Sequence, residues 1–199
     1  MDGLRLANAL MARGHWSAAV TNYRAAIRLA PGHATILYNT ALALHERHLD
    51  HDALKLLDET LMYRPGFALA RALRVSCLLA MGHTAEAVTA ARHSLQLLAA
   101  TAELYVALGH ALIASGARSE GIEALQDAVD LDDSSSLVLL AHGEALDDAG
   151  RKEEAVEHYL DGLAMSESND FRPLIGELLA RLGEAAPEKS ERMNYLQRA

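Results

Sequence analysis

The sequence predicts an all-α protein: a right-handed superhelix (α-solenoid) of helix–turn–helix units, each 34 residues long. The first observation is a repeat, because the pattern of residues 14–31, with Ala19 and Ala26 on either side of Tyr23, returns in register along the chain. The second is composition, since Ala and Leu dominate and favour helices. The third is a glycine that recurs at multiples of 34 residues, at Gly14, Gly82, Gly116 and Gly150, because glycine is favoured just after the end of a helix.

Each unit is expected to contribute two helices. Residues 2–13 form the first helix, because their apolar residues follow the three- and four-residue spacing of a helical stripe, and Gly14 ends it. Residues 16–30 form its partner, and Pro31-Gly32 turn the chain. The same order then repeats without insertion or deletion. The five units are 1–33, 34–67, 68–101, 102–135 and 136–169.

Small residues recur at one position of the first helix and one of the second. They predict a close approach of the two backbones, where a larger side chain would overpack. These positions are Ala7, Ala41, Val75, Gly109 and Gly143 in the first helices, and Ala19, Ala53, Ala87, Gly121 and Ala155 in the second.

Residues 170–199 are expected to form a capping pair of helices with a more polar outer face. Repeat stacks need such an end, because a terminal unit otherwise exposes the surface that a neighbour would cover. The first capping helix is expected at Phe171–Leu182, with Gly183 breaking it. The second starts at Pro187, a favourable first helical residue, and runs to the end.

The net charge of −9 is unevenly distributed. Residues 1–99 hold 10 Lys and Arg against 7 Asp and Glu, a net of +3, whereas residues 100–199 hold 8 against 20, a net of −12. An acidic chain is a poor binder of phosphate backbones, so no nucleic-acid partner is expected. The acidic half is either solvated surface or a surface that meets a basic partner.

Several classes of function are not expected. The single cysteine, Cys77, is interpreted as a small buried hydrophobe within a helix rather than a catalytic thiol. Phosphate-binding loops and nucleophile elbows are not found in the sequence, so an enzyme and a cofactor are not expected. The first residues do not resemble a signal peptide and no apolar stretch approaches membrane-spanning length, which favours a cytoplasmic protein without a membrane partner.

The histidines are candidate metal ligands. The densest group is His45, His48 and His51, which lie near Asp50 and Asp52. Metal ligands need lone pairs that converge on one point, and no cysteine or repeated histidine pair accompanies this group. We interpret it as solvated turn residues and expect no metal site.

The 34-residue period and the recurring small residues resemble the tetratricopeptide repeat family. The resemblance covers residues 1 to about 169 in register and the remainder loosely. It implies a non-enzymatic scaffold or adaptor that binds a peptide or helix of a partner protein in a concave groove, which is lined mainly by the first helix of each unit. The groove residues that it implies here are Asn8, Tyr38, Asn39, Leu42, His45, Ser76, Leu79, Val106, His110, Ile113, Glu144, Asp147 and Asp148.

This lining predicts a partner segment with apolar and basic residues, because the middle of the groove is apolar and one end is acidic. Some family members hold a carboxylate with two asparagines and three basic residues. Asn8 and Asn39 match those asparagines, but leucines stand at the basic positions, so no such clamp is expected. Two alternatives remain open: a domain that recruits substrate for a larger or associated enzyme, and a repeat protein that assembles with itself.

Overall fold

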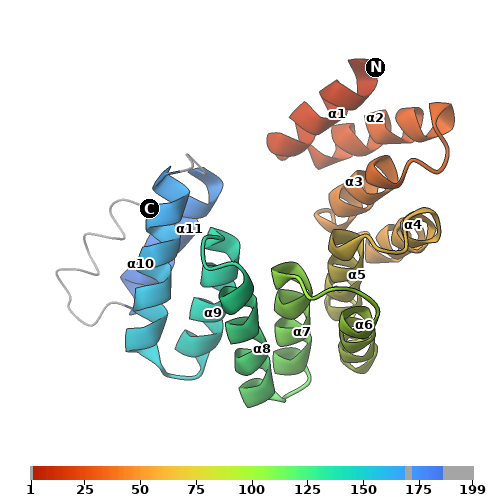
Figure 1. Cartoon of the computed structure of the whole chain (residues 1–199). Coiled ribbons are helices and arrows are strands. Elements are labelled where there is room, and N and C mark those ends of the chain that lie inside the picture. The colour runs from red at the N-terminus through yellow and green to blue at the C-terminus, as the bar shows by residue number, and fades with distance from the viewer. Residues whose placement is uncertain (1, 169–171, 186–199) are drawn as a thin grey trace. The chain divides into compact units, whose positions relative to one another are not determined.

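The computed structural model describes residues 2–168 and 172–185, and these residues fold into helices joined by short turns (Figure 1). The described part contains no strand, so the prediction of an all-α protein is confirmed. The helices are α1 (Asp2–Ala12), α2 (Trp16–Leu29), α3 (Ala34–His45), α4 (Asp50–Tyr63), α5 (Ala68–Ala80), α6 (Thr84–Leu97), α7 (Ala102–Ala114), α8 (Arg118–Leu131), α9 (Ser136–Asp148), α10 (Lys152–Ser168) and α11 (Arg172–Ala185).

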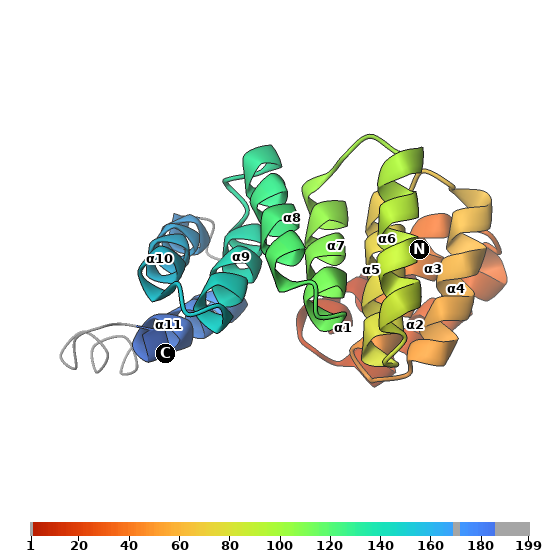
Figure 2. The ribbon, with the colours of Figure 1, turned by 90° about the horizontal axis from the view of Figure 1, so that it is seen from below.

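The chain divides into two compact units, which are described separately. Unit 1 is Met1–Ala100 and carries α1 to α6, while unit 2 is Thr101–Ala199 and carries α7 to α11. Within each unit, every helix packs against the next one along the chain (Figure 2). Unit 1 therefore coincides with the basic half of the sequence and unit 2 with the acidic half.

The turn inside each helix pair has one geometry. The residue at its tip has a positive φ, and the next residue's N–H bonds back to a carbonyl five residues earlier, as in His15 N to Leu10 O at 2.8 Å. This arrangement satisfies the last carbonyls of the first helix. Glycine occupies the tip at Gly14, Gly82, Gly116 and Gly150, but His48 occupies it between α3 and α4 with φ 57°.

Replacing His48 with glycine is expected to stabilise unit 1 by roughly 0.5–1 kcal/mol. A left-handed backbone costs a residue with a Cβ atom about 1–2 kcal/mol, and glycine's greater freedom in the unfolded chain offsets part of that gain. Urea unfolding of His48→Gly against wild type measures the effect. The matched control is His51→Gly inside α4, which should instead destabilise by up to about 1 kcal/mol.

Each unit has its own apolar core. In unit 1 the largest cluster joins α2 to α5, and its fully buried members include Ala41, Leu57 and Ala70. In unit 2 a cluster around Tyr159 and Leu178 joins α9, α10 and α11. All ten predicted small positions are buried, which agrees with the expected packing face.

The α7–α8 pair shows why two of those positions are glycine. A Cβ atom on Gly109 would lie 2.9 Å from the Gly121 carbonyl oxygen, and a Cβ on Gly121 would lie 2.9 Å from the Gly109 carbonyl oxygen. Real Cβ atoms essentially never approach so closely, so the two helices cross with backbone against backbone. The predicted close approach is confirmed for this pair.

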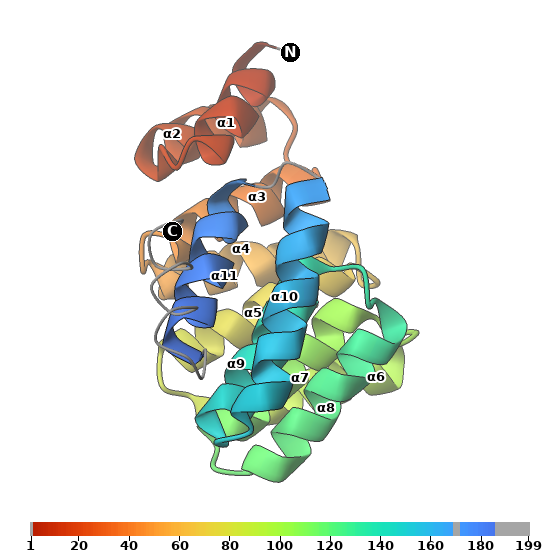
Figure 3. The same ribbon diagram turned by 90° about the vertical axis from the view of Figure 1, so that its left-hand side faces the viewer.

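The C-terminal prediction needs one correction. Helix α11 runs to Ala185 without interruption at Gly183, so the predicted break there is wrong (Figure 3). Gly183 is buried, and the packing of α11 beside α10 outweighs glycine's intrinsic cost of about 1 kcal/mol in a helix. The second capping helix, predicted from Pro187, lies outside the described residues.

Candidate functional site

Unit 1 contains a hollow of about 380 Å³ between α1, α2 and α3. Three of the predicted groove residues, Asn8, Asn39 and Leu42, lie together in its wall. Asn8 and Leu42 occupy the same position of consecutive first helices, 34 residues apart, and Asn39 lies three residues before Leu42 on α3. The stacking of α1, α2 and α3 brings the three side chains together. The full lining is Asn8, Met11, Ala12, Trp16, Tyr23, Asn39, Leu42 and Glu46.

The Tyr23 hydroxyl connects the two asparagines. It donates a hydrogen bond of 2.7 Å to Asn8 Oδ1. Burial raises the pKa of Tyr23 above its usual value, and a hydrogen bond from Asn39 opposes that rise. A buried neutral phenol thus holds an amide on each side, and because Asn8 uses its oxygen, its NH₂ group remains a donor toward the hollow.

The rest of the wall is mainly apolar. Met11, Trp16 and Leu42 are each half-buried, so they support the helices and still present apolar surface. Glu46, just beyond the end of α3, adds an exposed carboxylate. The hollow therefore combines amide donors and acceptors, an apolar floor and one negative charge.

Removing the Tyr23 hydroxyl is expected to loosen this arrangement. Tyr23→Phe leaves both asparagines without their shared partner, and we expect unit 1 to lose about 1 kcal/mol of unfolding free energy. Urea unfolding provides the measurement. Tyr63→Phe is the matched control, because Tyr63 is 58% exposed, and an equal loss in both variants would contradict the bridging role of Tyr23.

Other predicted residues of unit 1 lie outside the hollow. Tyr38 lies against Phe67, with ring centroids 5.0 Å apart, and the Arg64 guanidinium lies 4.6 Å from the centre of the Phe67 ring. Ser76 and Leu79 on α5 are half-buried, and the Ser76 hydroxyl donates to the Ala72 carbonyl at 3.4 Å.

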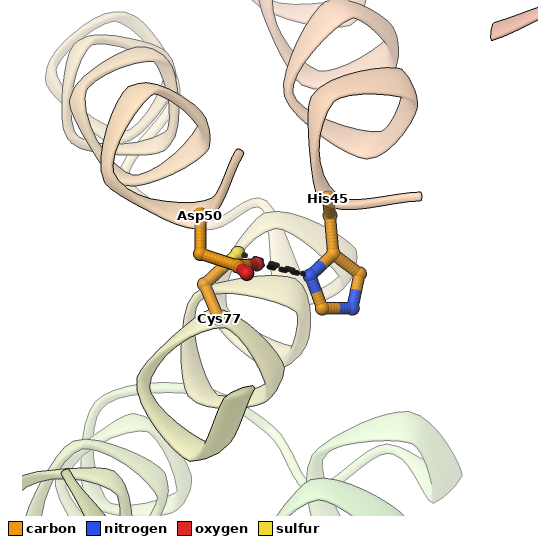
Figure 4. Close-up of side chains that lie close together, drawn as sticks. All are labelled: His45, Asp50 and Cys77. Atoms are coloured by element: carbon orange, nitrogen blue, oxygen red, sulfur yellow. Dashed lines mark hydrogen bonds and ion pairs between the residues drawn. The ribbon is translucent and has the colours of Figure 1, made fainter. Parts of the chain in front are cut away.

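His45 forms a cluster that the sequence did not predict. His45 Nδ1 lies 2.5 Å from Asp50 Oδ1 and 3.7 Å from Cys77 Sγ (Figure 4). Asp50 is 7% exposed and Cys77 is fully buried. The interpretation of this group as solvated turn residues is therefore wrong for Asp50 and holds only in part for His45, whose side chain is 24% exposed. It agrees with the exposure of His48 and His51. The burial predicted for Cys77 is confirmed.

In unit 2 the predicted residues come from α7 and α9. Val106 and Ile113 are half-buried and pack against the core, whereas His110 is exposed. Glu144 accepts a short hydrogen bond from the Arg181 guanidinium of α11. Asp147 is half-buried and Asp148 is exposed.

The pairing with Arg181 makes Glu144 less available to a basic ligand than the sequence predicted. Burial raises the pKa of the Glu144 carboxyl, while Arg181 opposes the rise. A basic ligand that used Glu144 would compete with a cation of the chain itself. The acidic residues predicted to bind the partner were Glu144, Asp147 and Asp148. Among the described residues, Arg181 is hydrogen-bonded to Glu144 but not to Asp147 or Asp148.

A membrane-crossing role finds no support in the helices that are described, because none is sufficiently long and apolar to span a bilayer. No curated protein matches the chain.

Solved structures are similar to the chain at low sequence identity. TTC0263, a thermophilic TPR protein of Thermus thermophilus, is 22% identical, and the match covers 89% of this chain and 97% of that one with a TM-score of 0.77. A chain of the APC/C hetero-tetramer Cut9-Hcn1 is 17% identical over 96% of this chain and 38% of its own, with a TM-score of 0.75. YrrB, a TPR protein with an unusual peptide-binding site, is 17% identical over 88% of this chain and 97% of its own, with a TM-score of 0.51.

Two family models match different parts of the sequence. A model described as TPR repeat matches residues 7–47, and one described as tetratricopeptide repeat matches residues 106–170. The two matches together cover more than half of the chain, one in each unit. The helix pairs at a 34-residue spacing agree with both, and the chain belongs to the tetratricopeptide repeat family.

Proposed function

We propose that the chain is an adaptor that binds a segment of a partner protein in the hollow of unit 1, and that the segment carries an apolar side chain next to a basic one. Members of this family generally serve as protein–protein interaction scaffolds. The observation that carries the proposal is the convergence of Asn8, Asn39 and Glu46 around an apolar floor.

The two asparagines suit the main chain of a bound segment. A primary amide offers two donors and one acceptor, so it can pair with peptide N–H and C=O groups whatever the side chains are. Tyr23 holds both amides through its hydroxyl before any ligand arrives. An amide fixed in advance loses less side-chain freedom on binding, which favours affinity.

The apolar floor and the carboxylate supply the selectivity. A hollow of about 380 Å³ is near the lower limit for ligand pockets, which suits one or two side chains of a peptide rather than a whole folded surface. Met11, Trp16 and Leu42 would surround the apolar side chain. Glu46 would pair with a Lys or Arg on the same segment, which selects against acidic segments.

One further observation supports a peptide as the ligand, and another supports a basic residue in it. YrrB, a structural neighbour, is described as having a peptide-binding site, so the fold is compatible with this use. Unit 2 carries a net charge of −12, and a basic segment that comes within about the Debye length of 8–10 Å of that unit's own surface would be attracted to it. The predicted residues Asp147 and Asp148 would contribute to that attraction.

The test is a selection of peptides from a random library on the immobilised full-length chain, followed by affinity measurements on the winning peptides. We expect sequences that combine an apolar residue with Lys or Arg. Glu46→Lys and Asn39→Leu should each weaken binding about tenfold, and the effect of Glu46→Lys should shrink at high salt.

The matched control is Glu86→Lys, which makes the same charge change at a 71% exposed side chain of α6 outside the hollow. Wild-type affinity is expected for this variant. If the selected peptides bind all three variants equally, or if the selection enriches no basic residue, the hollow is not the recognition site.

A further inference from the structure

Three side chains from three helices converge in the interior of unit 1. His45 ends α3, Asp50 begins α4 and Cys77 lies in α5, and one donor atom of each lies within 4.8 Å of the other two. Figure 4 shows the Asp50 carboxylate and the Cys77 sulfur beside the same nitrogen of the His45 ring, with the other ring nitrogen pointing away.

These residues interrupt the pattern of the repeat. Most of the other units carry apolar or small residues at the positions of His45 and Cys77, which contribute to ordinary packing there. The counterparts of His45 are Met11, Leu79, Ile113 and Asp147, and those of Cys77 are Ala9, Ala43, Ala111 and Ala145. Apolar packing is therefore sufficient at these positions in most of the 34-residue repeats. The polar side chains of His45, Asp50 and Cys77 call for a different explanation.

The geometry does not support a nucleophilic thiol. A relay needs the carboxylate on one imidazole nitrogen and the thiol on the other, but both groups face Nδ1 here. Burial and the nearby Asp50 charge also raise the pKa of the Cys77 thiol to about 12, which keeps it protonated when no cation is present.

We propose that His45 Nδ1, Asp50 Oδ1 and Cys77 Sγ form a three-ligand site for a divalent transition metal, with zinc as the best match. The nitrogen, oxygen and sulfur donors are those that zinc takes, at about 2.0–2.3 Å. Bonds of that length at a tetrahedral angle separate nitrogen from sulfur by about 3.5 Å. The observed separation is 3.7 Å.

Metal binding requires a small rearrangement. The hydrogen bond between His45 Nδ1 and Asp50 Oδ1, at 2.5 Å, must open by less than about 1 Å so that both atoms face the metal. Nδ1 gives up the proton of that hydrogen bond, so that the neutral ring carries its single proton on Nε2, and the Cys77 thiol proton leaves to solvent. Three protein ligands leave a fourth position for water. The His45 side chain is 24% exposed, so the site is close to the surface from which a metal ion would enter.

The bound ion would neutralise a poorly solvated carboxylate and fasten α3, α4 and α5 together. These three helices carry the core of unit 1 and, through α3, two walls of the hollow, Asn39 and Leu42. Metal binding should therefore raise the melting temperature of unit 1, because a ligand that binds only the folded state stabilises it.

The test is a titration of the reduced full-length chain with Co²⁺, followed by competition with Zn²⁺. We expect one ion per chain and a near-ultraviolet charge-transfer band from thiolate to Co²⁺. Cys77→Ala and His45→Leu place residues that other units carry at these positions, and each should weaken binding at least about tenfold and abolish or alter that band.

The double variant His48→Asn, His51→Asn is the control, because it removes two exposed histidines next to the cluster. It should bind as wild type does. Circular dichroism without metal establishes that Cys77→Ala and His45→Leu are folded, and Asp50→Asn provides a third variant if either is not. The proposal is overturned if wild type binds no ion, or if binding persists in the cluster variants and disappears in the control.

Discussion

Replacing Gly121 with leucine is expected to lower the unfolding free energy of unit 2 by about 3 kcal/mol, the upper end of the usual cost of overpacking. A Cβ atom there would lie 2.6 Å from Ile113 Cγ1 and 2.9 Å from the Gly109 carbonyl oxygen. The isoleucine side chain can rotate away, but the carbonyl belongs to α7 and cannot move alone. The two helices must therefore separate, and the contacts on both sides of the crossing weaken.

Thermal unfolding followed by circular dichroism measures this effect. For a unit of about 100 residues, a change of 1 kcal/mol shifts the melting temperature by roughly 4–8 °C, so the decrease expected for about 3 kcal/mol is roughly 12–24 °C. Ser119→Leu makes a similar addition on the exposed face of the same helix and should leave the melting temperature nearly unchanged. Equal decreases in the two variants would mean that α7 and α8 do not cross at Gly109 and Gly121.

The crossing of α7 and α8 could be predicted from the sequence because equivalent positions of the 34-residue repeats pack in the same way. Gly121 occupies the position of Ala19 and Ala53, and Gly109 that of Ala7 and Ala41. Five small residues at one register position identify a close contact without coordinates. The break predicted at Gly183 was wrong for a related reason: outside the repeat, a lone glycine carries only its weak intrinsic preference, and burial decides.

The hollow was predictable in part. Asn8, Asn39 and Leu42 were expected on the groove face because first-helix positions of consecutive units lie side by side. Trp16 and Tyr23 were not expected there, since both lie on α2, the second helix of the first 34-residue repeat. A signal existed for Tyr23, because a tyrosine among small residues at a buried position needs a partner for its hydroxyl.

Charge and metal-ligand chemistry were harder to predict, because their partners lie far apart in sequence. Glu144 pairs with Arg181, 37 residues away. Cys77 meets His45 across 32 residues, nearly one full repeat. Sequence proximity grouped His45 with His48 and His51, which are exposed, whereas the period of 34 groups His45 with residues near position 79. That period was the available signal for Cys77.

Unit 2 is expected to lose stability as the pH falls from about 6.5 to about 4, because of His142. This residue of α9 is 3% exposed, and its ring lies 4.5 Å from the ring of His158 on α10. Nδ1 of each ring is buried without a hydrogen-bond partner. Burial, together with the smaller effects of the charges of His158 and Arg151, lowers the pKa of His142 to about 4, although Glu154 and Asp130 oppose the shift.

The direction of the pH effect follows from the number of protons that the folded and unfolded chains bind. The unfolded chain binds a proton on His142 at about pH 6.5, whereas the folded chain binds it only near pH 4. Between these values the unfolded state holds more protons, so unfolding becomes more favourable as the pH decreases. At about 1.4 kcal/mol for each pKa unit, the loss is on the order of 2–3 kcal/mol when the pH reaches about 4.

Urea unfolding of unit 2 at about pH 7 and about pH 4.5 measures this loss. His142→Leu replaces the imidazole with the residue that α7 carries at the equivalent position, Leu108, and should retain more of its stability at the lower pH. His93→Leu removes an exposed histidine and should behave as wild type does. Carboxylates elsewhere titrate in all three proteins, so the comparison isolates His142. If His142→Leu loses as much stability as wild type, the pH dependence comes from those carboxylates and protonation of His142 does not destabilise the fold.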